Sequence, residues 1–132
     1  MESEWKNKDE KFWKTKLSKD AYKVTRKKGT EKPFTGEYVD NKAMGQYNCV
    51  CCDSPLFDAN TKFDSGTGWP SFSDIVDQNT VTLKPDNSLF RKRTEVVCKV
   101  CDAHLGHVFD DGPTSTGKRY CINSVALDFE KN

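Results

Sequence analysis

Residues 119–129 read Arg-Tyr-Cys-Ile-Asn-Ser-Val-Ala-Leu-Asp-Phe, and apolar side chains occupy alternate positions through the second half of this run. Every second side chain of an extended strand points to the same face, so Cys121 and Asn123 share a face with three apolar residues that follow. We expect the apolar residues to lie in a core, and Cys121 and Asn123 to stand together where the face leaves it. The apolar members are Val125, Leu127 and Phe129. Cys121 is also far in sequence from the other five cysteines, which singles it out for function.

The composition indicates one folded domain. A chain of 132 residues is long enough to bury one core, and its eight Phe, four Tyr and three Trp supply bulky side chains for it. Disordered chains are poor in aromatic residues, so the 31% of charged residues does not indicate disorder. We predict a single domain over residues 1–132, with a helical N-terminal segment at 1–30 and a β domain at 31–132.

The charge balance gives no case for a nucleic acid or membrane partner, because 21 Lys and Arg residues face 20 Asp and Glu residues. No apolar run approaches the roughly 18 residues of a spanning helix. The N-terminus has neither the apolar segment of a signal peptide nor the acid-poor composition of a transit peptide. We therefore expect a cytoplasmic protein in a reducing compartment. Nothing in the sequence suggests an obligate interface, so we expect a monomer.

Two helices are predicted in the N-terminal segment. Apolar residues recur over residues 5–17 with the spacing of one helical face. Ser18 is suited to cap a second helix with Ala21 and Val24 on its apolar stripe, and Gly29 is suited to end it. The segment also carries an excess of lysine, which we interpret as a solvated helix face because no motif of interleaved aromatic and basic residues accompanies it.

From residue 34 onward, short β-like runs alternate with turn residues, which predicts a mainly β fold with N-terminal helices. Residues 34–39 and 44–49 are expected to form a hairpin across Asp40-Asn41. Pro85-Asp86-Asn87 is predicted to be a turn. Further strands are predicted at residues 80–83, 89–97, 105–109 and 120–129.

Cys49-Val-Cys-Cys52-Asp and Cys98-Lys-Val-Cys101-Asp share the format Cys-x-x-Cys-Asp. Two matched pairs allow four thiolates to converge on one Zn²⁺, with Zn–S distances of about 2.3 Å. A closed site of four cysteines has no open coordination position, so the zinc would be structural and would pin two distant β segments together. A redox pair and a disulfide across the pairs stay open as alternatives. Cys51 lies inside the first pair, where we expect a free or partly buried thiol.

Both histidines of the chain lie in His104-Leu-Gly-His107. A regular strand would point them to opposite faces, but Gly106 favours a bulge that brings them together. A structural hydrogen-bonding role and a functional role are both open for this pair.

Trp69 lies in the glycine-flanked segment Gly66-Thr-Gly-Trp-Pro-Ser-Phe72, where backbone freedom allows close approach to a ligand, although Trp69 can equally plug a core. Together with the histidines, Cys121 and Asn123, it suggests thiol chemistry with a nucleophile, an acid or base, an amide and an aromatic wall. Acyl transfer, as in cysteine peptidases, stays open on these grounds. A buried and inert Cys121 is also open.

Four motifs, in this order, make the chain resemble the methionine-R-sulfoxide reductases, the B-type family. They are Pro33-Phe-Thr-Gly-Glu-Tyr38, Lys62-Phe-Asp-Ser-Gly-Thr-Gly-Trp-Pro-Ser-Phe72, His104-Leu-Gly-His-Val-Phe-Asp-Asp-Gly-Pro113 and Arg119-Tyr-Cys-Ile-Asn-Ser124. The resemblance runs from about Leu17 to Phe129. It implies two twisted antiparallel sheets with helices on the N-terminal side, stapled by a zinc site of four cysteines.

The resemblance also implies an oxidoreductase that reduces methionine-R-sulfoxide, free or in proteins, and so repairs proteins under oxidative stress. Cys121 matches the catalytic nucleophile and would become a sulfenic acid. His107, with His104 beside it, would hold and protonate the sulfoxide oxygen. Asn123 would orient the substrate or the histidine.

Two aromatic residues complete the site that the resemblance implies. Trp69 and Phe109 would wall the pocket for the ε-methyl group, and fixed places for methyl and oxygen would select one epimer. Cys49, Cys52, Cys98 and Cys101 match the zinc ligands that some members of the family keep.

One position departs from the family pattern. Many members carry a resolving cysteine where this chain has Thr67. The internal disulfide that this cysteine usually forms with the nucleophile therefore cannot form with Cys121 in this chain. Thioredoxin, another external thiol or Cys51 would then reduce the sulfenic acid, and we favour an external thiol. A zinc-stapled binding module without catalysis is the alternative function.

Overall fold

The computed structural model describes residues 2–87 and 92–132. Within them, three helices precede the strands, and the predicted mainly β fold with N-terminal helices is confirmed. The helices are α1 (Glu2–Lys6), α2 (Glu10–Lys16) and α3 (Lys19–Lys27). The strands are β1 (Gly45–Cys49), β2 (Pro55–Asp58), β3 (Lys62–Phe63), β4 (Ser71–Phe72), β5 (Val81–Asp86), β6 (Arg93–Cys98), β7 (His104–Phe109), β8 (Arg119–Ile122) and β9 (Leu127–Lys131). The described residues also form two short 3-10 helices, η1 (Ala59–Thr61) and η3 (Ser124–Ala126).

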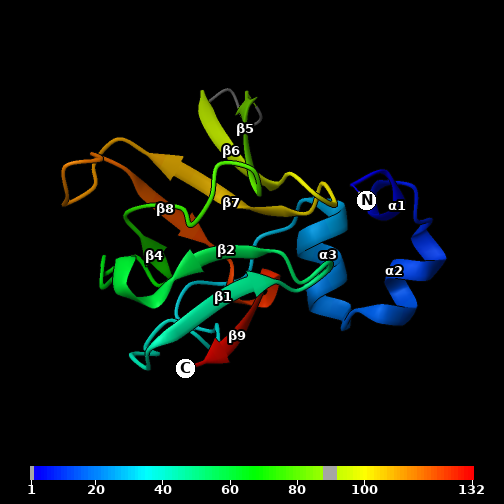
Figure 1. Ribbon diagram of the computed structural model, residues 1–132, viewed down its shortest axis with the longest axis horizontal. Coiled ribbons are helices and arrows are strands. Elements are labelled where there is room, and N and C mark those ends of the chain that lie inside the picture. The colour runs from blue at the N-terminus through cyan, green and yellow to red at the C-terminus, as the bar shows by residue number, and fades with distance from the viewer. Residues whose placement is uncertain (1, 88–91) are drawn as a thin grey trace.

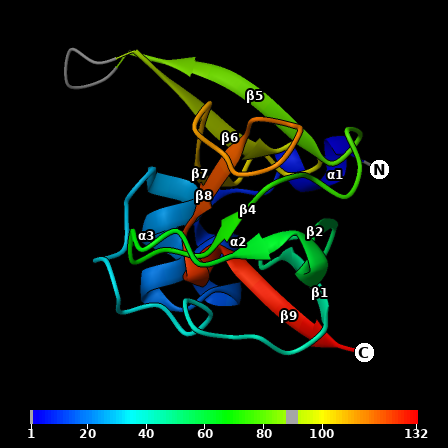
Figure 2. The same cartoon turned by 90° about the vertical axis from the view of Figure 1, so that its left-hand side faces the viewer.

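The strands form two antiparallel sheets, as expected. The small sheet has the order β2-β1-β9, and the large sheet has the order β3-β4-β8-β7-β6-β5. The helices gather at one side of the sheets (Figure 1). The β5–β6 pair forms one edge of the large sheet and lies at the opposite end of the molecule from β1 and β9 (Figure 2). In the described part of the chain, the helices are all too short or too polar to span a bilayer.

Aromatic side chains join the two sheets. Phe57 of β2 stacks on Phe72 of β4 with ring centroids 4.4 Å apart, and Tyr47 of β1 meets Phe72 edge-on at 5.1 Å. Tyr120 of β8 packs on Phe57. Tyr47, Phe57 and Phe72 are fully buried, and each such ring removes about 150–250 Å² from water. The side chains of the two sheets therefore pack against each other in the core.

The cap of α3 is confirmed, whereas the single helix over residues 5–17 is wrong. The Ser18 hydroxyl accepts a hydrogen bond from the Ala21 N–H at 3.1 Å, as an N-cap does. The chain breaks between α1 and α2, where the Asp9 carboxylate caps α2 by accepting from the Phe12 N–H at 2.9 Å. Local capping chemistry therefore ends the first helix early.

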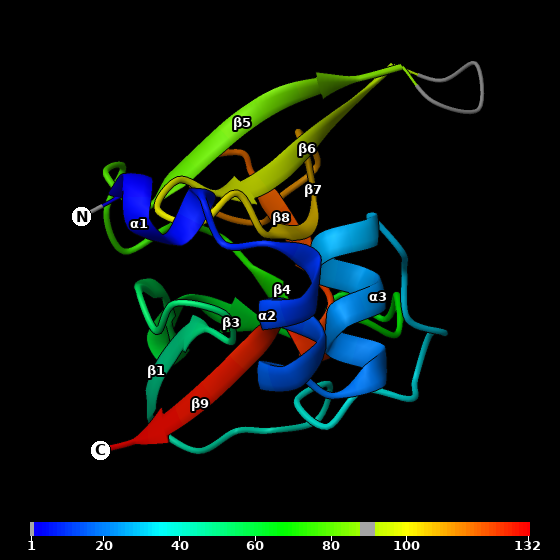
Figure 3. The same cartoon turned by 90° about the vertical axis from the view of Figure 1, so that its right-hand side faces the viewer.

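Helices α2 and α3 lie side by side and cover one end of the core (Figure 3). Their buried residues include Trp13, Leu17, Ala21 and Val24. Arg26 stacks on the Trp13 ring at 4.4 Å and donates to the carbonyl of Cys101 at 2.6 Å. The helical face predicted from the sequence thus packs on the second cysteine pair.

The predicted hairpin of residues 34–39 with 44–49 is wrong. Residues 45–49 do form β1, but β1 pairs with β2 and β9. Residues 34–39 form turns instead, and Phe34 has a φ of 66° and is 71% exposed. The first cysteine pair, and not Asp40-Asn41, supplies the turn that reverses β1 into β2.

The continuous strand over residues 120–129 is also wrong. Strand β8 ends at Ile122, η3 follows, and β9 then joins the small sheet. The Ala126 N–H bonds to the Asn123 carbonyl at 3.1 Å, which closes the turn between the sheets. Cys121 and Leu127 therefore belong to different sheets, although Leu127 is buried as expected.

The remaining strand predictions hold with shifted ends. The strand predicted at 80–83 runs on to Asp86, so the turn prediction is wrong at Pro85 and Asp86. Pro85 is tolerated because β5 is an edge strand of the large sheet. Of the strand predicted at 89–97, residues 89–91 lie outside the described residues and the rest forms β6.

Candidate functional site

One row of side chains crosses four neighbouring strands of the large sheet. Cys121 of β8 lies opposite Ser71 of β4 on one side and opposite His107 of β7 on the other. His107 in turn lies opposite Glu95 of β6. Directly opposite residues of antiparallel strands point to the same face. The register of the sheet therefore brings the predicted nucleophile and the predicted acid together.

A bulge in β7 brings the two histidines to one place, as predicted. Neighbouring residues of β6 pair with His104 and Gly106, so Leu105 is the extra residue between them. The rings of His104 and His107 lie 5.5 Å apart. A Cβ at Gly106 would lie 2.1 Å from the Cys121 carbonyl oxygen, so the close approach of β7 to β8 requires glycine.

A buried carboxylate holds each histidine ring. His104 Nδ1 donates to Glu95 at 2.7 Å, and His107 Nε2 donates to Asp86 at 2.8 Å. Arg93 lies 3.6 Å from the same Asp86 oxygen. Burial lowers the pKa of His104 below its ordinary value, although the bond to Glu95 opposes this shift. The carboxylates fix the orientation of both rings.

A pocket of about 120 Å³ opens beside the row. Five residues that the sequence singled out line it, namely Trp69, His107, Phe109, Cys121 and Asn123. Thr30, Arg93 and Gly106 complete the lining among the described residues. His104 is buried beside His107 and is not part of this lining. The structure thus brings five of the predicted residues together at one pocket. His104 lies next to His107 but outside the pocket lining.

Asn123 ties two segments to the pocket. Its side-chain N–H donates to the Leu105 carbonyl at 3.0 Å, and its side-chain oxygen accepts from the Glu31 N–H at 3.0 Å. The Glu31 carbonyl accepts from the Trp69 indole N–H, also at 3.0 Å. The Glu31 carboxylate accepts from the Val125 N–H. Glu31 therefore connects the pocket wall at Trp69 with the amide of Asn123.

Cys121 is a half-buried free thiol. Burial raises the pKa of the Cys121 thiol above its ordinary value, and the negative charge of Glu31 adds to this. The positive charge of Arg119 works in the opposite direction and favours the thiolate, as do the polar side-chain groups of Thr67 and Arg119. The burial effect is the largest, so the thiol form prevails in the free protein at neutral pH.

Arg119 links the nucleophile to the aromatic wall. Its guanidinium lies 4.5 Å from the centre of the Phe109 ring and forms an ion pair with Asp111 at 2.8 Å. The ion pair raises the pKa of Arg119 and lowers the pKa of Asp111. The stacked guanidinium keeps the Phe109 ring at the edge of the pocket.

The two cysteine pairs meet as the sequence predicts. The sulfur atoms of Cys49, Cys52, Cys98 and Cys101 all lie within 4.8 Å of one another. Cys49 and Cys101 are 3.6 Å apart, and Cys52 and Cys98 are 3.5 Å apart. Four thiolates at about 2.3 Å from one tetrahedral ion lie about 3.8 Å from each other. The cluster therefore fits a four-coordinate metal ion.

The backbone around the two pairs follows one pattern. Asp53 and Asp102, which follow the pairs, both have left-handed backbone, with φ of 67° and 64°. Each donates its N–H at 2.8 Å to the carbonyl of the first cysteine in its pair, Cys49 or Cys98. The repeated turn aims both pairs of thiols at the same point.

Cys51 lies beside the cluster but is not one of its four members. It is 1% exposed, and its thiol interacts with Thr25 of α3 and with neighbouring cysteines of the cluster. It is not among the described residues that line the Cys121 pocket. We predicted a free or partly buried thiol at Cys51, and the structure shows a free thiol that is buried.

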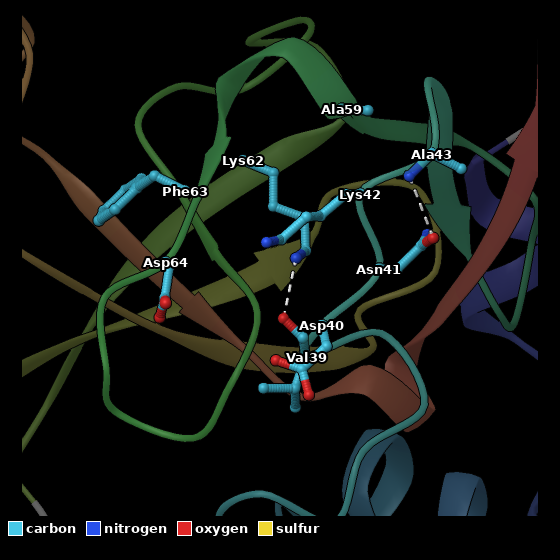
Figure 4. Close-up of a pocket in the computed structure, with 9 residues that line it drawn as sticks. All are labelled: Val39, Asp40, Asn41, Lys42, Ala43, Ala59, Lys62, Phe63 and Asp64. Atoms are coloured by element: carbon cyan, nitrogen blue, oxygen red, sulfur yellow. Dashed lines mark hydrogen bonds between the residues drawn. The ribbon is translucent and has the colours of Figure 1, made fainter.

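A second pocket, of about 280 Å³, lies beside β3 (Figure 4). The Lys62 ammonium reaches across it and donates to the Val39 carbonyl at 3.0 Å, and burial lowers the pKa of Lys62. The described residues that line this pocket include neither histidine nor cysteine. They are Val39, Asp40, Asn41, Lys42, Ala43, Ala59, Lys62, Phe63 and Asp64. The residues predicted for thiol chemistry line the smaller pocket instead.

Sequence reasoning missed the acids behind the histidines and the role of Glu31. Asp86 was assigned to a turn, and Glu95 was read as an ordinary strand residue. Glu95 lies next to the apolar residues Val96 and Val97, and a charged residue at a buried strand position is a signal that was available. Glu31 offers no such signal, because its contacts come from the path of a loop.

Comparison with known proteins identifies the family. The model of the SelR domain matches residues 17–131. The chain is 62% identical to "Peptide methionine sulfoxide reductase B1, chloroplastic" of Oryza sativa and 58% identical to the protein of the same name in Arabidopsis thaliana, over 90% and 95% of its length. It spans 56% and 62% of the length of these two relatives.

Other matches agree. "Peptide methionine sulfoxide reductase MsrB" of Methanosarcina mazei is 56% identical over 94% of this chain and 89% of that protein. The solved "Yippee-like" domain of Mis18 shares the fold, with a TM-score of 0.51 at 20% identity over 67% of this chain and 97% of that one. The chain belongs to the SelR-domain family, the B-type methionine sulfoxide reductases that its four motifs resemble.

Proposed function

We propose that this protein reduces methionine-R-sulfoxide, free or within proteins, to methionine through a sulfenic acid at Cys121. The observation that carries the proposal is the pocket in which Cys121 and His107 face a cavity walled by Trp69 and Phe109. A nucleophile, an acid and an apolar wall are the three groups that this reaction needs. The names of the relatives support the same activity.

The chemical step balances without a metal or an organic cofactor. The Cys121 sulfur bonds to the sulfoxide sulfur while the sulfoxide oxygen takes up a proton. The oxygen then passes to the Cys121 sulfur as a hydroxyl group, and the substrate leaves as methionine. The substrate sulfur gains two electrons and Cys121 loses two, which gives a reversible sulfenic acid.

His107 is the group that we assign to the sulfoxide oxygen. It lines the pocket directly across the strand pair from Cys121, and Asp86 holds its ring. Protonation of the oxygen turns a poor leaving group into a good one. His104 acts through its neighbour as a positioning residue, since it packs edge-on against the His107 ring and is itself held by Glu95.

The walls explain why one epimer is selected. Trp69 and Phe109 offer aromatic surface for the methyl group, since sulfur-bound groups pack well on aromatic rings. His107 fixes the place of the oxygen. Inversion at sulfur exchanges the two groups, so the other epimer would push oxygen against the aromatic wall.

An external thiol resets Cys121 in our proposal. A first thiol condenses with the sulfenic acid to give a mixed disulfide and water, and a second releases Cys121. Thioredoxin or another external thiol can fill this role. Cys51 is buried in the cysteine cluster against α3, so we assign it no part in this step. Mass spectrometry after one turnover without reductant would show a Cys51–Cys121 disulfide if this assignment were wrong.

We also propose one structural zinc ion per chain. Cys49, Cys52, Cys98 and Cys101 would hold it as thiolates, and it would supply no reaction chemistry because no coordination position stays open. The free state of all six cysteines suits a reducing, cytoplasmic setting. We expect the protein to act as a monomer.

The test supplies each sulfoxide epimer separately, with dithiothreitol as reductant. We expect turnover of the R epimer only and complete loss of activity in Cys121→Ser. The matched control is Cys51→Ser, which leaves the pocket intact and should retain activity. Turnover of the S epimer, or activity that survives Cys121→Ser, would refute the proposal.

A further inference from the structure

A lysine at the end of α3 reaches the carboxylate behind the buried histidine. His104 Nδ1 lies 2.7 Å from one oxygen of Glu95, and the Lys28 ammonium lies 3.3 Å from the other oxygen. Lys28 follows the last residue of α3, whereas Glu95 belongs to β6 and His104 to β7. The His104 ring in turn packs on the ring of His107, with 5.5 Å between the ring centres. A row of contacts therefore runs from Lys28 to the pocket.

The middle of this row is buried and its outer end is exposed. The side chains of His104 and Glu95 are 3% and 7% exposed, whereas that of Lys28 is 60% exposed. A buried carboxylate is costly unless it is paired. Here each oxygen of Glu95 has one partner, the histidine ring or the ammonium. Because an ionised carboxylate only accepts hydrogen bonds, His104 Nδ1 carries a proton.

The charge of Lys28 decides whether His104 takes a second proton. With Lys28 in place, the charges of Lys28 and Glu95 balance, and a neutral His104 ring completes the group. Without it, the negative Glu95 would face His104 alone and would favour the positive ring. Burial lowers the pKa of His104, and the charges of His107 and Lys28 lower it further, while Glu95 opposes them. Lys28 and burial therefore act in the same direction.

A neutral His104 matters because of its neighbour. His107 lines the pocket, and His104 is not among the described residues that do so. A proton on His104 therefore has no access to the pocket. The two rings are close enough for a positive charge on His104 to repel a proton on His107. The site works best when its one exchangeable positive charge lies on His107.

The backbone at Lys28 is strained. Lys28 has the left-handed φ and ψ of 57° and 35°, at a helix end where glycine is the usual residue because it has no Cβ. The glycine of this turn is the next residue, Gly29, whose N–H donates to the Lys23 carbonyl at 3.0 Å. The chain thus places a lysine at the strained position, and this lysine is the one that reaches Glu95. Strained backbone of this kind points to function.

We propose that Lys28 is a positioning residue that pairs with Glu95, keeps His104 neutral and so leaves the proton for catalysis on His107. The use of that proton in sulfoxide reduction rests on the proposed function. Lys28 is not among the described residues that line the pocket, so it acts through Glu95 and His104.

The described charged groups around the two histidine rings come from three further elements. Glu95 and Arg93 lie on β6, Asp86 lies on β5, and Lys28 lies at the end of α3. Asp86 holds His107, and Arg93 lies 3.6 Å from the Asp86 oxygen that does so. Of these groups Lys28 alone is mostly exposed. It can therefore be replaced while the buried charges stay in place.

Three variants of the full chain test the proposal. Lys28→Gly removes the ammonium and suits the left-handed backbone, so it should fold and melt near the wild-type temperature. Lys28→Arg keeps the positive charge. Lys27→Met is the matched control, because Lys27 is 56% exposed and pairs at 3.1 Å with Glu10, against 60% and 3.3 Å for Lys28 with Glu95. It removes the same charge one residue away.

The first measurement follows the histidine ring signals by NMR as the pH changes. The chain has two histidines, so each ring nucleus gives two signals, and His107→Gln assigns them. Lys28→Gly should raise the midpoint of the His104 titration by about half a pH unit, the size expected for a largely exposed ion pair. Lys28→Arg and Lys27→Met should leave the His104 midpoint at its wild-type value.

The second measurement is kcat for the R epimer at pH 6 and pH 8, with dithiothreitol as reductant. His104 takes up its second proton as the pH falls, so the loss in Lys28→Gly should grow toward acid. We expect near wild-type kcat at pH 8 and about threefold lower kcat at pH 6, which is half a pH unit expressed as a ratio. Lys28→Arg should match the wild type at both.

An unmoved His104 midpoint in Lys28→Gly, or an equal shift in Lys27→Met, would overturn the role of Lys28. A kcat ratio to the wild type that is the same at both pH values would overturn it as well, because a merely structural role predicts that result. The titration uses no sulfoxide, so it stands whatever the reductase assay gives. A shifted midpoint in a protein without turnover of the R epimer would refute the reductase alone.

Discussion

At the scale of single residues, the reactivity of Cys121 depends on opposing neighbours. Burial raises the pKa of its thiol, Glu31 adds to the rise and Arg119 opposes it. The thiolate fraction is therefore small at neutral pH and grows as the pH rises toward the pKa.

The two charges should be separable by substitution. Arg119→Gln removes the positive charge and should raise the pKa of Cys121, so alkylation at pH 8 slows. Glu31→Gln keeps an acceptor for the Val125 N–H but removes the negative charge, so alkylation at pH 8 should speed up. The double variant should fall between the two. Rates of iodoacetamide labelling at fixed pH check this, and a change of the same sign in both single variants would contradict it.

At the scale of elements, β7 and β8 determine the geometry of the site. Gly106 allows the two strands to approach, because a Cβ there would lie 2.1 Å from the Cys121 carbonyl oxygen. His107 and Cys121 are opposite each other in the same pair of strands. Any widening of the pair therefore moves the acid away from the nucleophile.

Gly106→Ala should cost about 1–3 kcal/mol of folding free energy, as overpacking does, and should lower kcat because His107 and Cys121 separate. The control is Gly117→Asn in the turn between the same strands, where nothing lies within 4 Å and asparagine tolerates a φ of 70°. Urea unfolding midpoints and turnover of the R epimer measure both effects. Wild-type turnover in Gly106→Ala would show that the approach of the strands is not needed.

The elements also show what a single sequence can predict. Ser18 as a cap was predictable, because it depends on local backbone chemistry. Gly106 correctly indicated a bulge in β7, although the extra residue is Leu105. The strand over residues 120–129 was wrong, because alternation does not reveal that the chain changes sheets at η3. Asp86 was missed for the same reason. It reaches His107 through pairing of β5, β6 and β7, which no local pattern encodes.

At the scale of the whole molecule, the four-cysteine cluster joins the two sheets. Cys49 ends β1 in the small sheet, and Cys98 ends β6 in the large sheet. The aromatic core also links them. A metal ion at the cluster would also anchor α3, because Arg26 donates to the Cys101 carbonyl at 2.6 Å. Loss of the ion should therefore loosen both the sheet packing and the helices.

Zinc removal should unfold most of the protein. Structural zinc contributes about 10–16 kcal/mol in small peptides, which is comparable with the about 5–15 kcal/mol that holds a whole domain folded. We expect chelation under reducing conditions to lower the thermal midpoint sharply and to abolish turnover together with it. Cys98→Ser should be isolated without zinc and unfolded, whereas Cys51→Ser should keep one zinc per chain, because Cys51 is not part of the metal cluster. Metal analysis and circular dichroism measure these outcomes. A zinc-free protein that melts like the wild type would show that the aromatic core between Tyr47, Phe57 and Phe72 holds the sheets without help.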